Sequence, residues 1–160
     1  MTYQITGLPR AAFDHLIGAT DAELARHNAV RVTATAKPGA PCRITLEDAE
    51  PGETLILVNH TSHDVANPYR ASHAIFVREQ APAALTYVDS IPPVMVPRVL
   101  SLRAFDADGM MIDALLTQPG QADQGIRELL NNPNVAYIHA HNATRGCFAA
   151  RIDRHEGSAA

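Results

Sequence analysis

Short segments in which apolar and polar residues alternate make up most of the chain. A period of two is typical of strands with one face buried, and breaks rich in proline and glycine separate the segments. Several of them follow one another closely enough to pair as hairpins, which predicts a largely antiparallel sheet. The segments are 3–9, 29–36, 42–47, 54–59, 74–79, 99–105, 110–116, 135–141 and 147–153.

Helical spacing of apolar residues is confined to regions near the two ends of the chain. It predicts helices over 10–17, 21–27 and 122–130. Thr20 and Glu23 have the spacing of a capping box in front of the second of these helices. The chain is therefore expected to be an α+β protein with a largely antiparallel sheet built from sequential hairpins. We expect one globular domain over 1–154 and a disordered tail over 155–160.

Composition narrows the classes of partner. A chain of 160 residues with a formal net charge of −4 lacks the basic surface that nucleic acid requires. No apolar run approaches the ~18 residues of a membrane span, and the N-terminus lacks a secretory signal. We therefore expect a soluble cytoplasmic protein with two free thiols, Cys42 and Cys147. Of its 13 basic residues only Lys37 is a lysine, which indicates either coding bias or selection for bidentate anion contacts.

Motifs of several common enzyme classes are absent from the sequence. It contains no GxGxxG, GxxxxGK[ST], GxSxG, HExxH or CxxC. Dinucleotide binding, P-loop hydrolysis, lipase-type catalysis, zincin chemistry and thioredoxin chemistry are disfavoured accordingly. The stretch "DADG" at 106–109 is better explained as a hairpin turn than as a calcium loop, because the remaining oxygen ligands do not follow.

The last hairpin, "VAYIHAHNATRGCFAARID" at 135–153, concentrates the reactive residue types. A five-residue loop over 142–146 would place His141 opposite Cys147, and directly opposed residues have Cβ atoms about 5 Å apart. Ile138, Phe148 and Ile152 would then share the other, apolar face. One polar patch results, made of Tyr137, His139, His141, Cys147 and Arg151.

Several kinds of chemistry remain open for this patch. His139 and His141 are spaced as two metal ligands from one strand, and a zinc-like set would need a further thiolate or carboxylate. Cys147 is a candidate catalytic nucleophile, with His141 and the neighbouring Arg145 favouring its thiolate. A third interpretation is ligand binding without catalysis. The same side chains could also be purely structural.

A polar stretch without clear periodicity, 59–73, is predicted to be a long loop over this patch. Arg70 and Arg145, with Arg43 as a third candidate, could bind a small acid through their planar guanidinium groups. Tyr137 and Arg151 are further candidate ligand-binding residues. Alternatively, the arginines pair internally with Glu47, Asp48 or Glu79. The loop histidines His60, His63 and His73 are candidate ligands or simply solvated.

Five phrases resemble one bacterial family, "domain of unknown function 1203". They are "ITGLP", "PCRITLEDAEPGE", "NPYRASHAIFVRE", "LSLRAFDADGMM" and "AYIHAHNATRGCFAARID". The resemblance implies a single-domain bacterial protein and supplies no activity. The 59–66 stretch is less similar to the family pattern than its flanks, and His73 stands where that pattern has glycine. A family-wide role for His60, His63 and His73 is therefore disfavoured.

The sequence thus predicts a small-ligand or metal site, formed by the last hairpin and the 59–73 loop. Its expected occupant is a small anionic ligand or a divalent metal such as zinc. The alternative is a non-catalytic interaction module or homodimer, in which these residues are structural.

Overall fold

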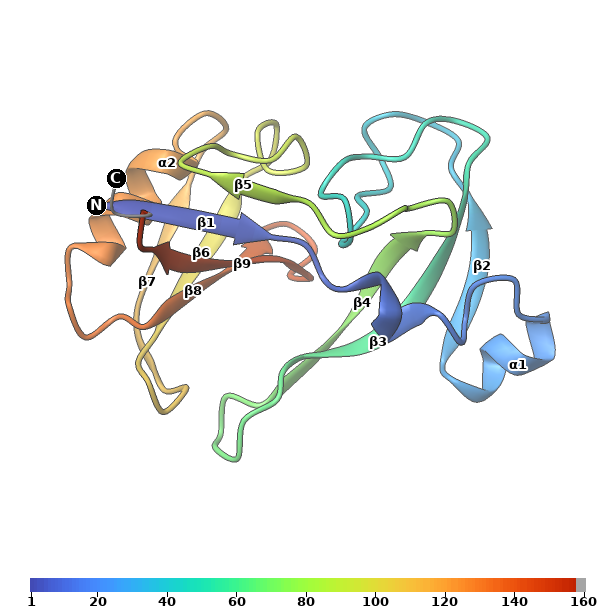
Figure 1. Cartoon of the computed structure of the whole chain (residues 1–160), viewed down its shortest axis with the longest axis horizontal. Coiled ribbons are helices and arrows are strands. Elements are labelled where there is room, and N and C mark those ends of the chain that lie inside the picture. The colour runs from blue at the N-terminus through green and yellow to red at the C-terminus, as the bar shows by residue number, and fades with distance from the viewer. Residues whose placement is uncertain (158–160) are drawn as a thin grey trace.

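A computed structural model describes residues 1–157 as two antiparallel sheets that lie side by side (Figure 1). The six-stranded sheet has the order β5 (Thr86–Val88), β1 (Thr2–Thr6), β9 (Phe148–His155), β8 (Tyr137–Asn142), β6 (Leu100–Phe105), β7 (Met111–Thr117). The three-stranded sheet has the order β2 (Ala29–Thr33), β3 (Thr54–His63), β4 (Ala71–Arg78). With two α-helices beside these sheets, the architecture fits the expected α+β class.

The helices are short. They are a 3-10 turn η1 (Arg10–Phe13), α1 (Asp21–Arg26) and α2 (Ala122–Leu130). The predicted capping box is present: the Thr20 hydroxyl accepts from the Glu23 N–H at 3.2 Å, and the Glu23 carboxylate accepts from the Thr20 N–H at 2.7 Å. Within residues 1–157, no helix is both long and apolar enough to cross a membrane.

Two main hydrophobic cores follow from this arrangement. The first lies between α2 and one face of the six-stranded sheet, where Leu129 packs with Ile138 and Ile152. The second joins the two sheets, because it contains Ile75 of β4 together with Phe148 of β9. Burial of apolar area contributes about 25 cal/mol per Å², so the second core stabilises the packing of one sheet against the other.

The predicted strand over 42–47 is wrong. The Cys42 N–H donates to the Glu47 carbonyl at 2.9 Å, and the Leu46 N–H donates to the Cys42 carbonyl at 3.0 Å, which closes a compact turn. Side chains of both parities, including Ile44 and Thr45, are buried in this turn. A half-exposed strand would bury only one parity. Consequently β3 pairs with β2 and β4 rather than with 42–47.

The predicted 59–73 loop is also wrong, because most of it is strand. His60 pairs with His73 and Thr61 with Ser72, so β3 and β4 form a long hairpin that only 64–70 connects. Most side chains in this part of both strands are polar, so the sequence shows no alternation of apolar and polar residues there.

The first predicted helix, 10–17, forms only the 3-10 turn η1.

Strand β9 reaches His155, which pairs with Thr2. The strand therefore extends one residue into the segment predicted to be a tail. The last residues of that segment, 158–160, lie outside the described part of the chain.

Gly7, directly after β1, lies against the backbone of the 42–47 turn. The Leu8 N–H donates to the Arg43 carbonyl at 2.7 Å. A Cβ on Gly7 would lie 1.8 Å from the Ile44 carbonyl oxygen, a backbone atom that cannot rotate away. Glycine is therefore required for the turn to dock on β1.

We predict that Gly7→Ala lowers the free energy of unfolding by at least about 2 kcal/mol, since the turn and β1 must separate to admit the methyl group. Urea denaturation followed by circular dichroism measures the change. Gly157→Ala is the matched control, because a Cβ there meets open space. Equal stability of the two variants would contradict the proposed close approach.

Candidate functional site

The last hairpin does not have the predicted register. His139 pairs with Arg151 and His141 with Phe148, and a β-bulge between these pairs leaves Ala149 without a partner. The Asn142 N–H donates to the Cys147 carbonyl at 2.9 Å. Asn142, not His141, is therefore opposite Cys147, and the predicted His141–Cys147 pair is not formed.

The bulge allows β9 to contribute a large apolar side chain to each of the two cores. Phe148 joins the inter-sheet core, where its ring centroid lies 5.1 Å from that of His139. Ile152 remains on the other face, against α2. The prediction placed Phe148 and Ile152 on one face, whereas the extra residue sends them to opposite faces. Gly146, at φ +81°, adopts the left-handed conformation in the short loop.

Cys147 is half-buried, and its sulfur receives two N–H donors. Arg43 Nη2 donates to Sγ at 3.2 Å and Asn142 Nδ2 donates at 3.3 Å. His141 instead donates from Nδ1 to the Gly146 carbonyl at 3.0 Å. The partner of the thiol is therefore a guanidinium far away in sequence, not the histidine proposed from strand spacing.

Arg43 is only 2% exposed and forms no ion pair with any carboxylate of residues 1–157. Besides the sulfur, it donates to the Phe148 carbonyl at 2.8 Å and to the Pro41 carbonyl at 2.7 Å. Desolvation lowers the pKa of this guanidinium, because burial disfavours its charged form. Among residues 1–157, Cys147 is the one group hydrogen-bonded to the Arg43 side chain that could carry a compensating negative charge.

The three carboxylates that the sequence offers as internal partners for the arginines form ion pairs with arginines other than Arg43. Glu47 pairs with Arg78, Asp48 with Arg98, and Glu79 with Arg31. Internal pairing thus occurs, but it bypasses Arg43.

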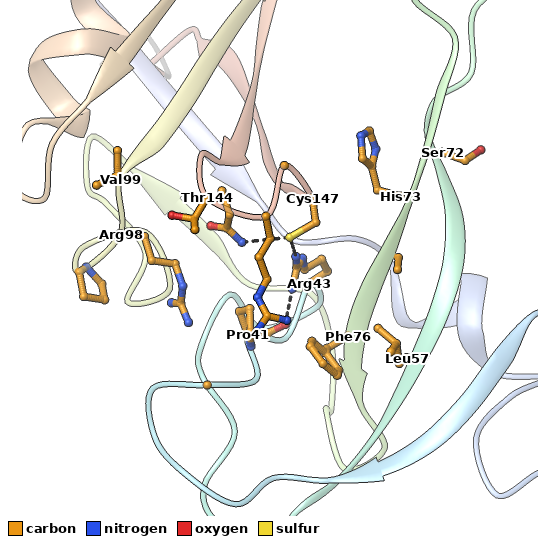
Figure 2. Close-up of a pocket in the computed structure, with 16 residues that line it drawn as sticks. Pro41, Arg43, Leu57, Ser72, His73, Phe76, Arg98, Val99, Thr144 and Cys147 are labelled. Atoms are coloured by element: carbon orange, nitrogen blue, oxygen red, sulfur yellow. Dashed lines mark hydrogen bonds between the residues drawn. The ribbon is translucent and has the colours of Figure 1, made fainter.

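A pocket of about 850 Å³ opens beside Cys147, between the two sheets (Figure 2). Its walls come from the 142–147 loop, from β4, from the 39–43 segment and from 97–99. No aspartate or glutamate from the described part of the chain lines it. Its basic side chains are Arg43, His73, Arg98 and Arg145.

Arg98 and Arg145, two further arginines that line the pocket, differ in whether they are paired with a carboxylate. Arg98 donates to both carboxylate oxygens of Asp48, at 2.7 and 2.9 Å, and to the Val94 carbonyl at 2.6 Å. Arg145 is exposed on the hairpin loop and has no salt bridge to a carboxylate within residues 1–157. Arg145 is therefore available to a ligand without first breaking an ion pair.

Behind the pocket, four histidines pack with aromatic rings on the inner face of the six-stranded sheet. The ring of His73, at the pocket wall, lies 4.8 Å from that of His141. His63 donates from Nδ1 to the Tyr69 carbonyl, so Nε2 accepts from the Tyr137 hydroxyl at 2.6 Å. The histidine cluster consists of His63, His73, His139 and His141.

Burial keeps two members of this cluster uncharged. Desolvation is the main cause that lowers the pKa of His139 to about 3 and that of His141 to about 4. Nearby cations, among them Arg103, act in the same direction. Both imidazoles are therefore neutral near pH 7, and the positive charge of the inter-sheet region resides on arginines.

The remaining predicted site residues do not line the pocket beside Cys147. The Arg151 guanidinium lies 4.0 Å above the Tyr137 ring and pairs with Asp153. Arg70 is exposed, pairs with Asp64, and borders a smaller pocket of about 200 Å³. Of the candidate site residues predicted from the sequence, four line the pocket beside Cys147: Arg43, Arg145, His73 and Cys147.

The zinc-like ligand set around His139 and His141 is not assembled. Within residues 1–157, no three His, Cys, Asp or Glu side chains are grouped so that they could hold a metal ion. The hairpin register explains this result, because it places Phe148 rather than Cys147 beside the two histidines.

Sequence reasoning missed Arg98 and Asn142. Arg98 follows the proline-rich connection 91–97. The path of this connection cannot be predicted from the periodicity of apolar residues. Asn142 was assigned to a loop, whereas it is the last residue of β8. No local signal identifies either one, because both become pocket residues through contacts between distant segments.

A family model described as "Protein of unknown function (DUF1203)" matches residues 39–154. Every residue that lines the pocket lies within this range. No curated protein and no solved structure matches the chain.

The buried histidines predict acid sensitivity. A histidine with a folded pKa of about 3 and an ordinary value of 6.5 is more protonated in the unfolded state between these values. Its stabilising contribution is therefore full above pH 6.5 and is lost as the pH falls towards 3. His139→Phe should reduce the decline in unfolding free energy by about 1.4 kcal/mol per pH unit within this window.

Urea denaturation between pH 7 and pH 4 measures this slope. His15→Gln, at an exposed histidine, is the control and should retain the wild-type slope. Parallel curves for wild type and His139→Phe would show that His139 is not buried in its neutral form.

Proposed function

The chain belongs to the DUF1203 family of proteins of unknown function, and we propose that it binds a small anionic ligand in the pocket beside Cys147. The observation that carries the proposal is the buried Arg43 guanidinium, which contacts the pocket without a carboxylate partner among residues 1–157. A buried charge is costly unless it is paired. A bound anion would add negative charge to a pocket that no aspartate or glutamate of residues 1–157 lines.

Arg145 adds a second guanidinium without a carboxylate partner among residues 1–157 to the pocket lining, whereas the Arg98 guanidinium is already paired with Asp48. Guanidinium groups bind carboxylates and phosphates through two parallel N–H donors. Arg145 sits on the loop that also carries Cys147, and its side chain is free of ion pairs to the described carboxylates. It is thus the residue best suited to make first contact with an acidic ligand.

Apolar side chains also line the pocket. Leu57 and Phe76 of the three-stranded sheet and Val99 line the same pocket (Figure 2). A site that combines a few charged groups with apolar walls suits an organic molecule. The proposed ligand is therefore a small organic acid, whose body lies on Leu57 and Phe76 and whose carboxylate faces the arginines.

We predict that benzoate and succinate raise the melting temperature and bind measurably in calorimetry, whereas benzamide, the uncharged counterpart of benzoate, does not. Arg145→Gln should weaken anion binding at least about tenfold, because a charge-assisted hydrogen bond contributes about 1.5–3 kcal/mol. This variant changes an exposed side chain and therefore spares the fold.

Arg26→Gln is the matched control, since Arg26 is an exposed arginine on α1 outside the pocket. It should bind benzoate like the wild type. Equal binding of benzoate and benzamide, or equal losses in both arginine variants, would contradict the proposed role of the pocket.

A second candidate function, homodimerisation, is favoured by the edge strand β7. This strand pairs only with β6 and exposes Leu116 (60%) and Ile112 (41%). Exposed edge strands with apolar side chains are ready templates for pairing with another chain. The occupant of this edge would be β7 of a second copy.

If β7 mediates a dimer, Leu116→Lys should convert it to a monomer, because the lysine would place a charge at the edge. Light scattering coupled to gel filtration measures the mass. Val30→Lys, at an exposed apolar residue of the other sheet, is the control and should leave the dimer intact. A monomeric wild-type protein would refute this second candidate.

A further inference from the structure

The sulfur of Cys147 occupies the position of an acceptor. Arg43 donates to it at 3.2 Å and Asn142 donates at 3.3 Å. Guanidinium and amide nitrogens are donors only, so both neighbours orient N–H bonds towards Sγ. The other end of the Asn142 amide, Oδ1, is buried without a hydrogen-bond partner among the described residues. It can accept from a group of a bound ligand.

Charge balance indicates the form of this sulfur. Arg43 is 2% exposed, and its other contacts are two neutral carbonyl oxygens. Carbonyls satisfy N–H donors but carry no compensating charge. A thiolate at Cys147 would complete an ion pair with the buried guanidinium, and a thiolate is the nucleophilic form of cysteine.

We infer that Cys147 is a nucleophile that attacks a carbon of the acid held in this pocket. The inference rests on the proposed function, because the arginines must first bind the carboxylate of the same molecule. The sulfur lines the pocket, and Figure 2 shows it between Arg43 and the wall that carries His73. The substrate class is a small carboxylic acid with a displaceable group on a carbon near the carboxylate.

The covalent step balances without a further reactant. The Sγ lone pair forms the S–C bond, and the leaving group departs with the electron pair of the bond that breaks. No proton is released, because the thiolate carries none. Arg43 then loses its anionic neighbour and retains the neutral thioether sulfur. The carboxylate of the bound acid keeps its negative charge through the step and remains in the pocket, and the leaving group carries away the charge that the thiolate loses.

Cys42 provides an internal contrast. It is fully buried, and its sulfur accepts only backbone N–H groups, from Ile44 at 3.4 Å and from Arg78 at 3.3 Å. It belongs to the inter-sheet core and does not line the pocket. Its thiol should react only after unfolding.

Iodoacetate and iodoacetamide test the inference, because they deliver the same electrophilic carbon with and without a carboxylate. The neutral amide is ordinarily the faster reagent towards protein thiols. We expect Cys147 of the native protein to react at least tenfold faster with iodoacetate than with iodoacetamide, measured by intact mass and peptide mapping at pH 7. Cys42 should remain unlabelled, and Cys147→Ser should abolish the native reaction.

The two arginine variants show whether the preference for iodoacetate comes from anion binding in the pocket or from the general reactivity of the thiol. Arg145→Gln should lose the preference for iodoacetate, whereas Arg26→Gln should keep the wild-type ratio of rates. Benzoate should protect Cys147 from iodoacetate in the wild type.

Failure of the inference is distinguishable from failure of the proposed function. If benzoate binds by calorimetry but Cys147 is labelled no faster than in the urea-unfolded protein, the pocket binds anions and the nucleophile is refuted. If benzoate does not bind and Cys147 reacts without preference for iodoacetate, both are refuted. Faster labelling of Cys42 than of Cys147 in the native state would also overturn the inference.

Discussion

The burial of the Arg43 guanidinium is the constraint on which the rest of the structure depends. Its side chain donates to the Phe148 carbonyl on β9 and to the Pro41 carbonyl in its own segment. Its backbone N–H donates to the Phe76 carbonyl on β4 at 3.0 Å, and its carbonyl accepts from Leu8. One residue therefore ties both sheets and the segment after β1 together. A buried charge is tolerated only with good hydrogen-bond geometry and a compensating partner, and the Cys147 sulfur is the acceptor that Arg43 contacts besides these carbonyls.

The β-bulge in the last hairpin has a comparable role for the apolar residues. Without it, Phe148 and Ile152 would lie on the same face of β9, since side chains alternate along a regular strand. The six-stranded sheet must supply residues to two cores, one under α2 and one between the sheets. The extra residue, Ala149, divides the strand so that each core receives a large side chain. The same shift leaves Cys147 outside the ladder, at the edge of the pocket.

Sequence reasoning succeeded where local rules decide the structure. The Thr20 capping box and the antiparallel α+β class follow from patterns within a few residues of one another. It failed at 42–47 and 59–73, where tertiary contacts override or hide periodicity. The 42–47 turn buries side chains at both odd and even positions, so the alternation of apolar and polar residues there did not indicate which side chains are buried. The register of the last hairpin depended on loop length, and a bulge of one residue is sufficient to remove His141 from Cys147.

The distribution of charge between histidines and arginines determines how the inter-sheet region can respond to its surroundings. The deeply buried His139 and His141 are neutral near pH 7, and aromatic rings rather than solvent surround them. Arginine remains charged at all physiological pH values. An anion in the pocket therefore meets a positive charge that pH does not modulate between 6 and 8. His139 and His141 instead affect the fold at acid pH, because their protonation introduces charge into a buried interior. The proposed ligand binding and the acid sensitivity thus belong to two different sets of residues, which meet where His73 contacts His141 and where His141 donates to the carbonyl of Gly146 in the pocket lining.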